Sequence, residues 1–197
     1  KKVNKQKLQK TFGLSVDQRI PLFGLVTRLF KQKGLDILLP AIEQFLKKEK
    51  FQLVVLGSGQ VEYEKALKNL QSKYPKTVAV KIGFDARLAQ KIYAASDFFL
   101  MPSFFEPCGL GQMIAMRYGS IPIVRATGGL KDTVSSQSGL VFKKYSQSEL
   151  ERMIKKALRL YNAPRMFNNM VKYDMQLDFS WKKSALAYQK LYKKLLK

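Results

Sequence analysis

The chain has 197 residues, 46% of them apolar, which is enough to bury the core of one large domain. One cysteine and no histidine exclude a disulfide framework, zinc sites built on cysteine or histidine, and Ser-His triads within the chain. A net charge of +22 is typical of chains with a polyanionic partner and also of lysine-rich, solvated helix faces. We favour solvated faces and expect no nucleic-acid partner, because the lysines are spread along the chain and are densest at 1–10 and 182–197.

No apolar run approaches the roughly eighteen residues of a membrane-spanning helix, so a membrane partner is not expected. The sequence begins Lys-Lys-Val-Asn, without a starting methionine or an apolar signal region. We therefore expect it to be part of a longer polypeptide, whose acidic remainder would balance some of the positive charge.

Apolar runs alternate with helical patterns, and each apolar run is continuous, which is typical of parallel strands covered on both faces. The alternation predicts a doubly wound parallel α/β sheet, followed by three extra C-terminal helices, with a polar surface loop at 131–138. The last helix is predicted to be capped by Ser180 and to carry Trp181 and Tyr188 on an apolar stripe. The predicted strands are 20–26, 51–56, 77–82, 97–101, 121–124 and 139–142. The predicted helices are 35–46, 61–74, 88–95, 112–118, 147–161, 164–173 and 180–196.

The segment 103–112 joins an apolar strand to a helix and is the most informative part of the sequence. It places Glu106, a proline and two glycines at the carboxyl end of a strand, where open α/β sheets bind ligands. Bare amides at the following helix start favour an anion such as a phosphate. Glu106 is either a sugar-binding, charge-stabilising carboxylate or an acid that merely complements the helix dipole. Cys108 is predicted to be a small packed residue, because no histidine is present to activate it.

Four other features follow strands. Arg28 and Lys33 flank the first strand-to-helix loop, where they could grip a diphosphate or be ordinary solvated cations. Gly57-Ser58-Gly59 is predicted to be a simple tight turn rather than a phosphate cradle. Phe84 could stack on a base or form the rim of the core, and the paired glycines of 125–130 allow close approach to a ligand. Because these features follow successive strands, we expect them to converge at one edge of the sheet.

Together these residues resemble the bacterial glycogen synthase and plant starch synthase family of glycosyltransferases, over about residues 24–192. The resemblance is carried by the segments 28–34, 102–110, 117–119, 127–134 and 178–181. It implies the GT-B fold, in which two Rossmann-like domains face each other across a cleft, and the chain resembles the C-terminal, nucleotide-binding one. Residues 1–173 would form that Rossmann-like domain. Residues 174–197 would form a C-terminal helix crossing toward the absent N-terminal domain.

The resemblance also implies roles for individual residues. Arg28 and Lys33 would hold the diphosphate of ADP-glucose and stabilise the leaving ADP, and Phe84 would stack against adenine. Glu106 would lie near the glucose 3-hydroxyl and, with the two cations, would be catalytic. The other implied donor-binding residues are Gly109, Leu110, Gly111, Thr127, Gly128 and Gly129.

The implied reaction is retaining transfer of glucose from ADP-glucose to the 4-hydroxyl end of an α-1,4-glucan, with no metal or other cofactor. The chain alone is expected to be essentially inactive, since the absent domain completes the site. The implied compartment is the cytoplasm of a bacterium or the plastid of a plant or alga. Ile114 stands where UDP-sugar relatives carry a second glutamate, and Gln90 where the family usually has histidine. Two alternatives stay open: a transferase using another nucleotide sugar, and a non-catalytic glucan- or polyanion-binding domain.

Overall fold

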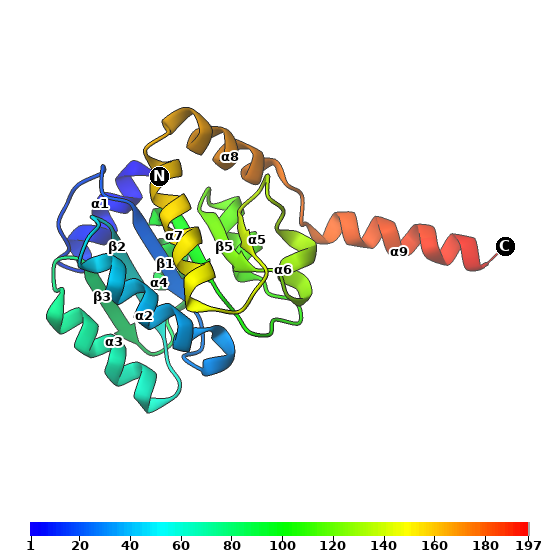
Figure 1. Cartoon of the computed structure of the whole chain (residues 1–197). Helices are drawn as coiled ribbons and strands as arrows, with labels where there is room; N and C mark the ends of the chain where they lie inside the picture. The colour runs from blue at the N-terminus through cyan, green and yellow to red at the C-terminus, as the bar shows by residue number, and fades with distance from the viewer. Residues whose placement is uncertain (197) are drawn as a thin grey trace.

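A six-stranded parallel sheet forms the centre of the computed structural model, which describes residues 1–196 (Figure 1). The strand order is β3-β2-β1-β4-β5-β6, that of a doubly wound Rossmann sheet, so the predicted fold class is confirmed. Because every pair is parallel, the carboxyl ends of the strands lie at one edge. The strands are β1 Leu22–Val26, β2 Gln52–Gly57, β3 Val78–Ile82, β4 Phe98–Met101, β5 Ile121–Arg125 and β6 Leu140–Phe142.

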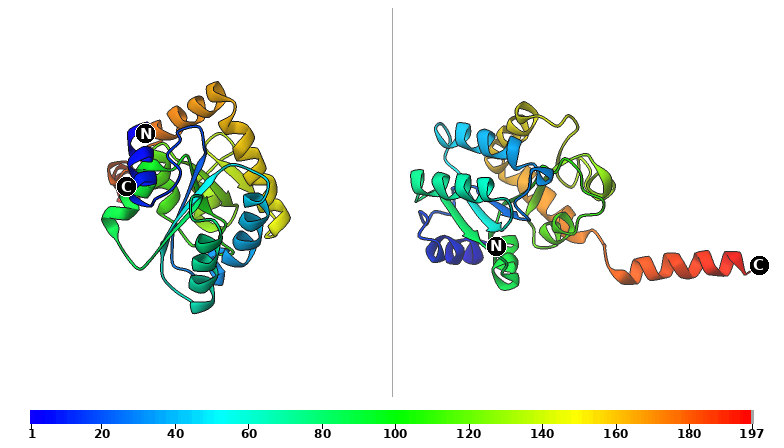
Figure 2. Two further views of the ribbon diagram at one scale, coloured as in Figure 1. Left: turned by 90° about the vertical axis from the view of Figure 1, so that its left-hand side faces the viewer. Right: turned by 90° about the horizontal axis from the view of Figure 1, so that it is seen from below.

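Helices cover both faces of the sheet (Figure 2). Those on one face are α2 (Leu35–Leu46), α3 (Val61–Lys73) and α7 (Gln147–Tyr161). Those on the other are α1 (Lys2–Thr11), α4 (Ala86–Ala95) and α5 (Gly111–Arg117). A short 3-10 turn, η1 (Lys31–Lys33), precedes α2; α6 (Gly128–Thr133) follows β5; and α8 (Pro164–Gln176) packs beside α5 and α7. Within residues 1–196, no helix has the length and apolar character needed to cross a bilayer.

Burial on both faces explains the continuously apolar strands. Phe23 of β1 stacks on Phe98 of β4 with ring centroids 5.2 Å apart, and meets Phe51 edge-on at 5.3 Å. These rings belong to the larger apolar core, between the sheet and α2, α3 and α7. A second cluster, around Ile92 of α4, joins α1 and α4 to the opposite face.

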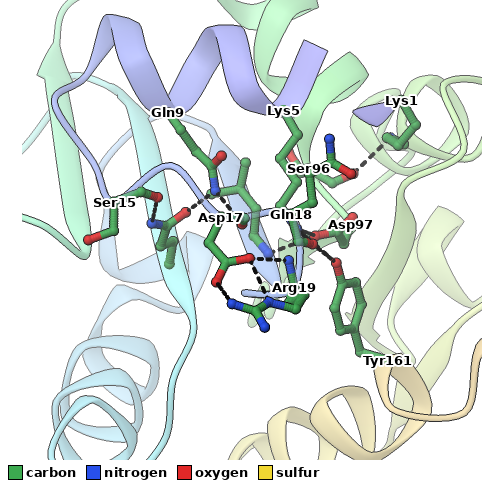
Figure 3. Close-up of polar contacts among 12 residues, drawn as sticks. Lys1, Lys5, Gln9, Ser15, Asp17, Gln18, Arg19, Ser96, Asp97 and Tyr161 are labelled. Atoms are coloured by element: carbon green, nitrogen blue, oxygen red, sulfur yellow. Dashed lines mark hydrogen bonds and ion pairs between the residues drawn. The ribbon is translucent and has the colours of Figure 1, made fainter. Parts of the chain in front are cut away.

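The helix α1 is not predicted from the sequence. The lysines of residues 1–10 are expected to be solvated, and this prediction is wrong for Lys5, which is only 2% exposed. Its Nζ lies 2.6 Å from Asp97 Oδ2 and also donates to the Tyr161 hydroxyl at 2.9 Å (Figure 3). Burial raises the pKa of Asp97 and lowers that of Lys5, and each charge opposes the shift of the other. A lysine-rich pattern gives no sign of a partner 92 residues away.

Asp97 anchors α1 to the amino edge of the sheet. Its Oδ2 also accepts the backbone N–H of Leu22 at 2.8 Å, at the start of β1, while Asp97 itself directly precedes β4. Gln9 extends the attachment by donating to Gln52 Oε1 at 2.8 Å, at the start of β2 (Figure 3). The buried polar groups of α1 thereby fix the beginnings of three neighbouring strands.

The helix α9 (Trp181–Leu195) extends away from the sheet as a separate rod (Figure 1). Ser180 caps it as predicted, its Oγ accepting the N–H of Lys183 at 3.4 Å. The apolar stripe faces solvent, since Trp181 is 88% exposed and Tyr188 59% exposed. The proposed division of the chain after residue 173 stays a prediction, and α8 itself runs to Gln176.

Residues 131–138 are not the simple surface loop that is predicted. The helix α6 continues to Thr133, and Ser138 is buried, its Oγ accepting the N–H of Ser135 at 2.9 Å. Serine side chains make such local bonds in loops and helix ends alike, so polarity alone does not separate the two.

Asp174 is an isolated acid on the buried side of α8. It is 1% exposed, and neither carboxyl oxygen has a hydrogen-bond partner among the described residues. Burial raises the pKa of Asp174 to about 8. The unfolded chain ionises this group near pH 4, roughly its ordinary value. Between the two values the unfolded state binds fewer protons, so stability falls as the pH rises.

Lys5→Met keeps the apolar stem and removes the charge, so Asp97 is left buried without its counter-ion. We expect the free energy of unfolding to fall by about 3 to 5 kcal/mol, the usual cost of an uncompensated buried charge. Urea denaturation followed by far-UV circular dichroism measures this change. The control is Lys2→Met, at an exposed position of the same helix. Equal effects of the two substitutions would contradict the buried ion pair.

Asp174→Asn removes the ionisation and with it the loss of stability at higher pH. Its advantage over the native chain in free energy of unfolding should grow with pH and reach about 2 to 5 kcal/mol near pH 8. Urea titrations at several pH values between about 5 and 8 measure this. For Asp132→Asn, at an exposed position of α6, the free energy of unfolding should instead differ from that of the native chain by the same amount at every pH. An advantage that does not change with pH would rule out a buried ionisable acid.

Candidate functional site

The predicted site residues follow strands at the carboxyl edge of the sheet and lie in two groups. Arg28 and Phe84 line a cavity beyond β1, β2 and β3. Lys33, Glu106 and Gly128 lie together beyond β4 and β5. The loop 27–34, between β1 and α2, contributes to both groups.

Lys33 and Glu106 form an ion pair where the loops after β1 and β4 meet. Lys33 Nζ lies 2.7 Å from Glu106 Oε2, and the two side chains are only 15% and 10% exposed. Ser103 Oγ donates to the same oxygen at 3.1 Å. Glu106 is not in the first turn of α5, so the interpretation as a helix-dipole acid is wrong. It is a largely buried carboxylate held by two donors.

Close backbone packing brings Lys33 to this position. The turn η1 ends at Gly34, whose φ of 81° is left-handed, and a Cβ there would lie 2.2 Å from the carbonyl oxygen of Pro102. Only glycine lets the loop after β1 touch the end of β4 so closely. Gln32 adds a hydrogen bond, because its main-chain carbonyl accepts the N–H of Phe104 at 2.9 Å.

Arg125, at the end of β5, holds the segment before Glu106 from the other side. Its Nε donates to the carbonyl of Ser103 at 2.9 Å, and a terminal nitrogen donates to the carbonyl of Phe104. Its guanidinium carbon lies 5.6 Å from the ring centroids of both Phe104 and Tyr145. The sequence does not predict this role; an arginine ending an apolar strand is the only signal for it.

The start of α6 fixes the backbone of Glu106. Gly129, two residues after Thr127, donates its N–H to the carbonyls of Glu106 and Pro107, both at 3.1 Å. Gly128 has a φ of 43°, and a Cβ on it would lie 2.0 Å from the carbonyl oxygen of Glu106. The main chain of Glu106 is therefore held independently of its side chain.

A cavity of about 240 Å³ lies between the carboxyl ends of β1, β2 and β3. Phe84 lines it and is 94% exposed, so Phe84 is not a rim residue of the core. Arg28 is also exposed, with its guanidinium carbon 5.6 Å from the ring centroid of Phe30. The segment 57–59 pairs with the loop 27–34, since the main-chain carbonyl of Ser58 accepts the N–H of Leu29 at 2.9 Å. An open aromatic face beside a cavity and a cation suits a planar ring that carries an anion.

The residues between Glu106 and α5 are mostly exposed. Cys108 is exposed, so its predicted packing is wrong. The buried side chain nearby is Gln112, whose Nε2 donates to the carbonyl of Gly109 at 2.8 Å. Leu110 is 64% exposed, and the first-turn amides of α5, beginning with Gly111, have no acceptor within the helix.

Two departures from the family pattern lie outside the core. Gln90 is exposed and lines a groove between α4 and α1. Ile114, on α5, is 37% exposed. Among residues 1–196, no three His, Cys, Asp or Glu side chains gather into a cluster that could hold a metal ion.

Comparisons with known proteins match this fold and site. The family described as glycosyl transferases group 1 matches residues 6–173. The glycogen synthases of Alkaliphilus metalliredigens and Clostridium beijerinckii are each 48% identical to the chain in alignments of 202 positions, which cover 99% of the chain and 42% of each relative. The chain thus spans about two fifths of the length of the curated relatives it matches.

Solved structures give the same result. The catalytic domain of starch synthase IV from Arabidopsis thaliana, bound to ADP and acarbose, aligns with a TM-score of 0.87 and 37% identity over 98% of this chain and 42% of that one. Sucrose-phosphate synthase from Thermosynechococcus elongatus aligns with a TM-score of 0.73 and 25% identity over 95% of this chain and 48% of that one. The predicted resemblance to glycogen and starch synthases is confirmed.

Gly128→Ala should destabilise the protein more than Gly13→Ala. Both glycines have left-handed backbones, with φ of 43° and 64°, but only a Cβ at Gly128 meets another atom within 4 Å. We expect the free energy of unfolding to fall by about 2 kcal/mol more for Gly128→Ala, because the contact with Glu106 must open. Urea denaturation of the two variants makes the comparison. Equal losses would show that the close approach at Gly128 carries no strain.

Proposed function

The chain belongs to the family of group 1 glycosyl transferases, and on that premise we propose that it is the donor-binding half of a glucan synthase that uses ADP-glucose. The observation that carries the proposal is the Lys33–Glu106 pair at the carboxyl edge of a fold that matches starch synthase IV bound to ADP. Glycogen synthases with 48% identity support the same substrate class.

In this proposal the diphosphate of ADP-glucose binds Arg28 and Lys33, the cations of the loop 27–34. The guanidinium fork of arginine suits phosphate oxygens, and lysine adds a mobile point charge. Adenine stacks on Phe84, whose ring is open to solvent beside the cavity. The main chain at the starts of α5 and α6 completes the donor site, through Gly109, Leu110, Gly111, Thr127, Gly128 and Gly129.

The proposed reaction retains the configuration of the transferred sugar. The bond between the glucosyl carbon and the diphosphate oxygen breaks, and ADP leaves with the electron pair. The 4-hydroxyl oxygen of the α-1,4-glucan bonds to that carbon and gives up its proton to a phosphate oxygen of the leaving ADP. Arg28 and Lys33 offset the charge that grows on the leaving phosphate, and Glu106 offsets the positive charge that grows on the sugar. We propose that these cations act without a metal or other cofactor.

The acceptor glucan and an N-terminal domain are the remaining partners that we propose. A transfer reaction needs donor and acceptor positioned together, so the chain alone should bind ADP without appreciable turnover. The apolar stripe of α9, with Trp181 88% exposed, suits coverage by that second domain. The compartment would be the cytoplasm of a bacterial host or the plastid of a plant or algal one.

Calorimetry with the 197-residue chain should show tighter binding of ADP than of UDP, because a purine offers Phe84 the larger stacking face. Arg28→Ala and Lys33→Ala should each weaken ADP binding about tenfold or more, since each removes a charge-assisted contact to phosphate. Lys47→Ala is the control, because Lys47 is exposed at the other end of α2.

The alternatives give different results in the same experiment. Unchanged ADP affinity after both site substitutions would remove the phosphate assignment. A preference for UDP would favour a transferase that uses another nucleotide sugar. Binding of ADP and DNA alike, with a steep decline as salt rises, would favour a polyanion-binding domain. Binding of glucan without ADP would favour a non-catalytic glucan module.

A further inference from the structure

Lys33, which the proposed function assigns to the donor diphosphate, is already bound to an acid. Its Nζ lies 2.7 Å from Glu106 Oε2, and within residues 1–196 no other hydrogen bond or ion pair is made by this Nζ. Exposure of 15% and 10% places the pair partly out of water, where attraction between charges exceeds that of a surface pair. A diphosphate that enters the site therefore meets a neutralised lysine and a neighbouring carboxylate.

We propose that Glu106 and the donor diphosphate compete for Lys33, so that the ion pair is a latch which donor binding opens. This inference rests on the proposed function, because it takes a nucleoside diphosphate as the ligand. If Lys33 stayed on Glu106, it would neutralise the diphosphate only partly, and the added negative charge would repel the carboxylate. Transfer of the lysine from carboxylate to phosphate removes the first cost, and in exchange the attraction between Lys33 and Glu106 is lost.

The contacts indicate which partner moves. The main chain of Glu106 is fixed by the N–H of Gly129, and its carboxylate keeps the Ser103 hydroxyl as a donor at 3.1 Å when the lysine leaves. Lys33 carries its charge on a flexible four-carbon stem. Opening the latch therefore requires a new lysine rotamer, while the loops after β1 and β4 stay in place.

Arg28 supplies the first contact in this sequence of events. It is exposed, and none of the ion pairs among the described residues includes it. An incoming diphosphate binds it without breaking any pair. Only then does the phosphate draw Lys33 from Glu106, so the two cations of one loop have different tasks.

Withdrawal of Lys33 changes the state of Glu106. A carboxylate without its counter-ion attracts the positive charge that grows on the sugar more strongly than a neutralised one does. Ser103 is the positioning residue that keeps this carboxylate in place. The latch thereby makes Glu106 fully effective only after the diphosphate has arrived.

A double-mutant cycle on ADP affinity, measured by calorimetry, tests the latch. Glu106→Gln keeps the shape of the side chain and frees Lys33, and Lys33→Met removes the lysine from either background. Repulsion between carboxylate and diphosphate is present in both backgrounds and cancels. If the diphosphate takes Lys33 from Glu106, Glu106→Gln should tighten ADP binding about 3- to 30-fold more in the native chain than in the Lys33→Met chain.

Equal tightening in the two backgrounds would overturn the latch, because Lys33 would then bridge carboxylate and phosphate without leaving. Absence of ADP binding by the native chain would overturn the proposed function instead. Far-UV circular dichroism confirms folding of each variant, and Lys33→Gln replaces Lys33→Met if the latter does not fold. Asp132→Asn removes an exposed acid of α6 and is the control for charge alone, with the same effect expected in both backgrounds.

Discussion

The adjacency of β1 and β4 is the constraint on which the candidate site depends. The chain proceeds outward from β1 through β2 to β3, then returns to β4 on the other side, so the loops after β1 and β4 run in opposite directions and leave a crevice between them. Lys33 comes from one loop and Glu106 from the other, 73 residues further along. At the amino edge, Asp97 and Lys5 tie the beginnings of the same two strands to α1. The candidate site thus lies at the carboxyl ends of β1 and β4, and the contacts of Asp97 hold the amino ends of the same two strands.

Much of the fold could be predicted from the apolar pattern alone. The helices α2 and α7 begin and end at the predicted residues, because a strong 3.6-residue period continues to their ends. Strand ends shift by one or two residues, since the hydrogen-bond ladder rather than hydrophobicity decides the last residue. The helix α1 could not be predicted, because lysines mask its apolar face and the partner that buries Lys5 comes from a distant part of the chain.

The gathering of the candidate site residues at one edge of the sheet could be predicted, whereas their contacts with one another could not. Glycines and an acid after parallel strands indicate which edge of the sheet binds ligands. The contacts of Arg125 go to backbone carbonyls, which every residue offers, so no side-chain pattern reveals them. Cys108 is exposed although the sequence predicts it to be packed, because side-chain direction in an irregular loop follows no period. The pairing of Lys33 with Glu106 needs the three-dimensional strand order.

The single tryptophan of the chain lies on α9, a helix in which no residue is buried. Indole emission depends on the solvent that surrounds the ring, and the Trp181 side chain is 88% exposed. The intrinsic fluorescence of this protein is therefore a local probe of α9. It should be insensitive to melting of the sheet and sensitive to any surface that comes to cover the helix. Tryptophan fluorescence, which follows the packing of the core in many proteins, here follows the surroundings of α9, the helix that extends away from the core.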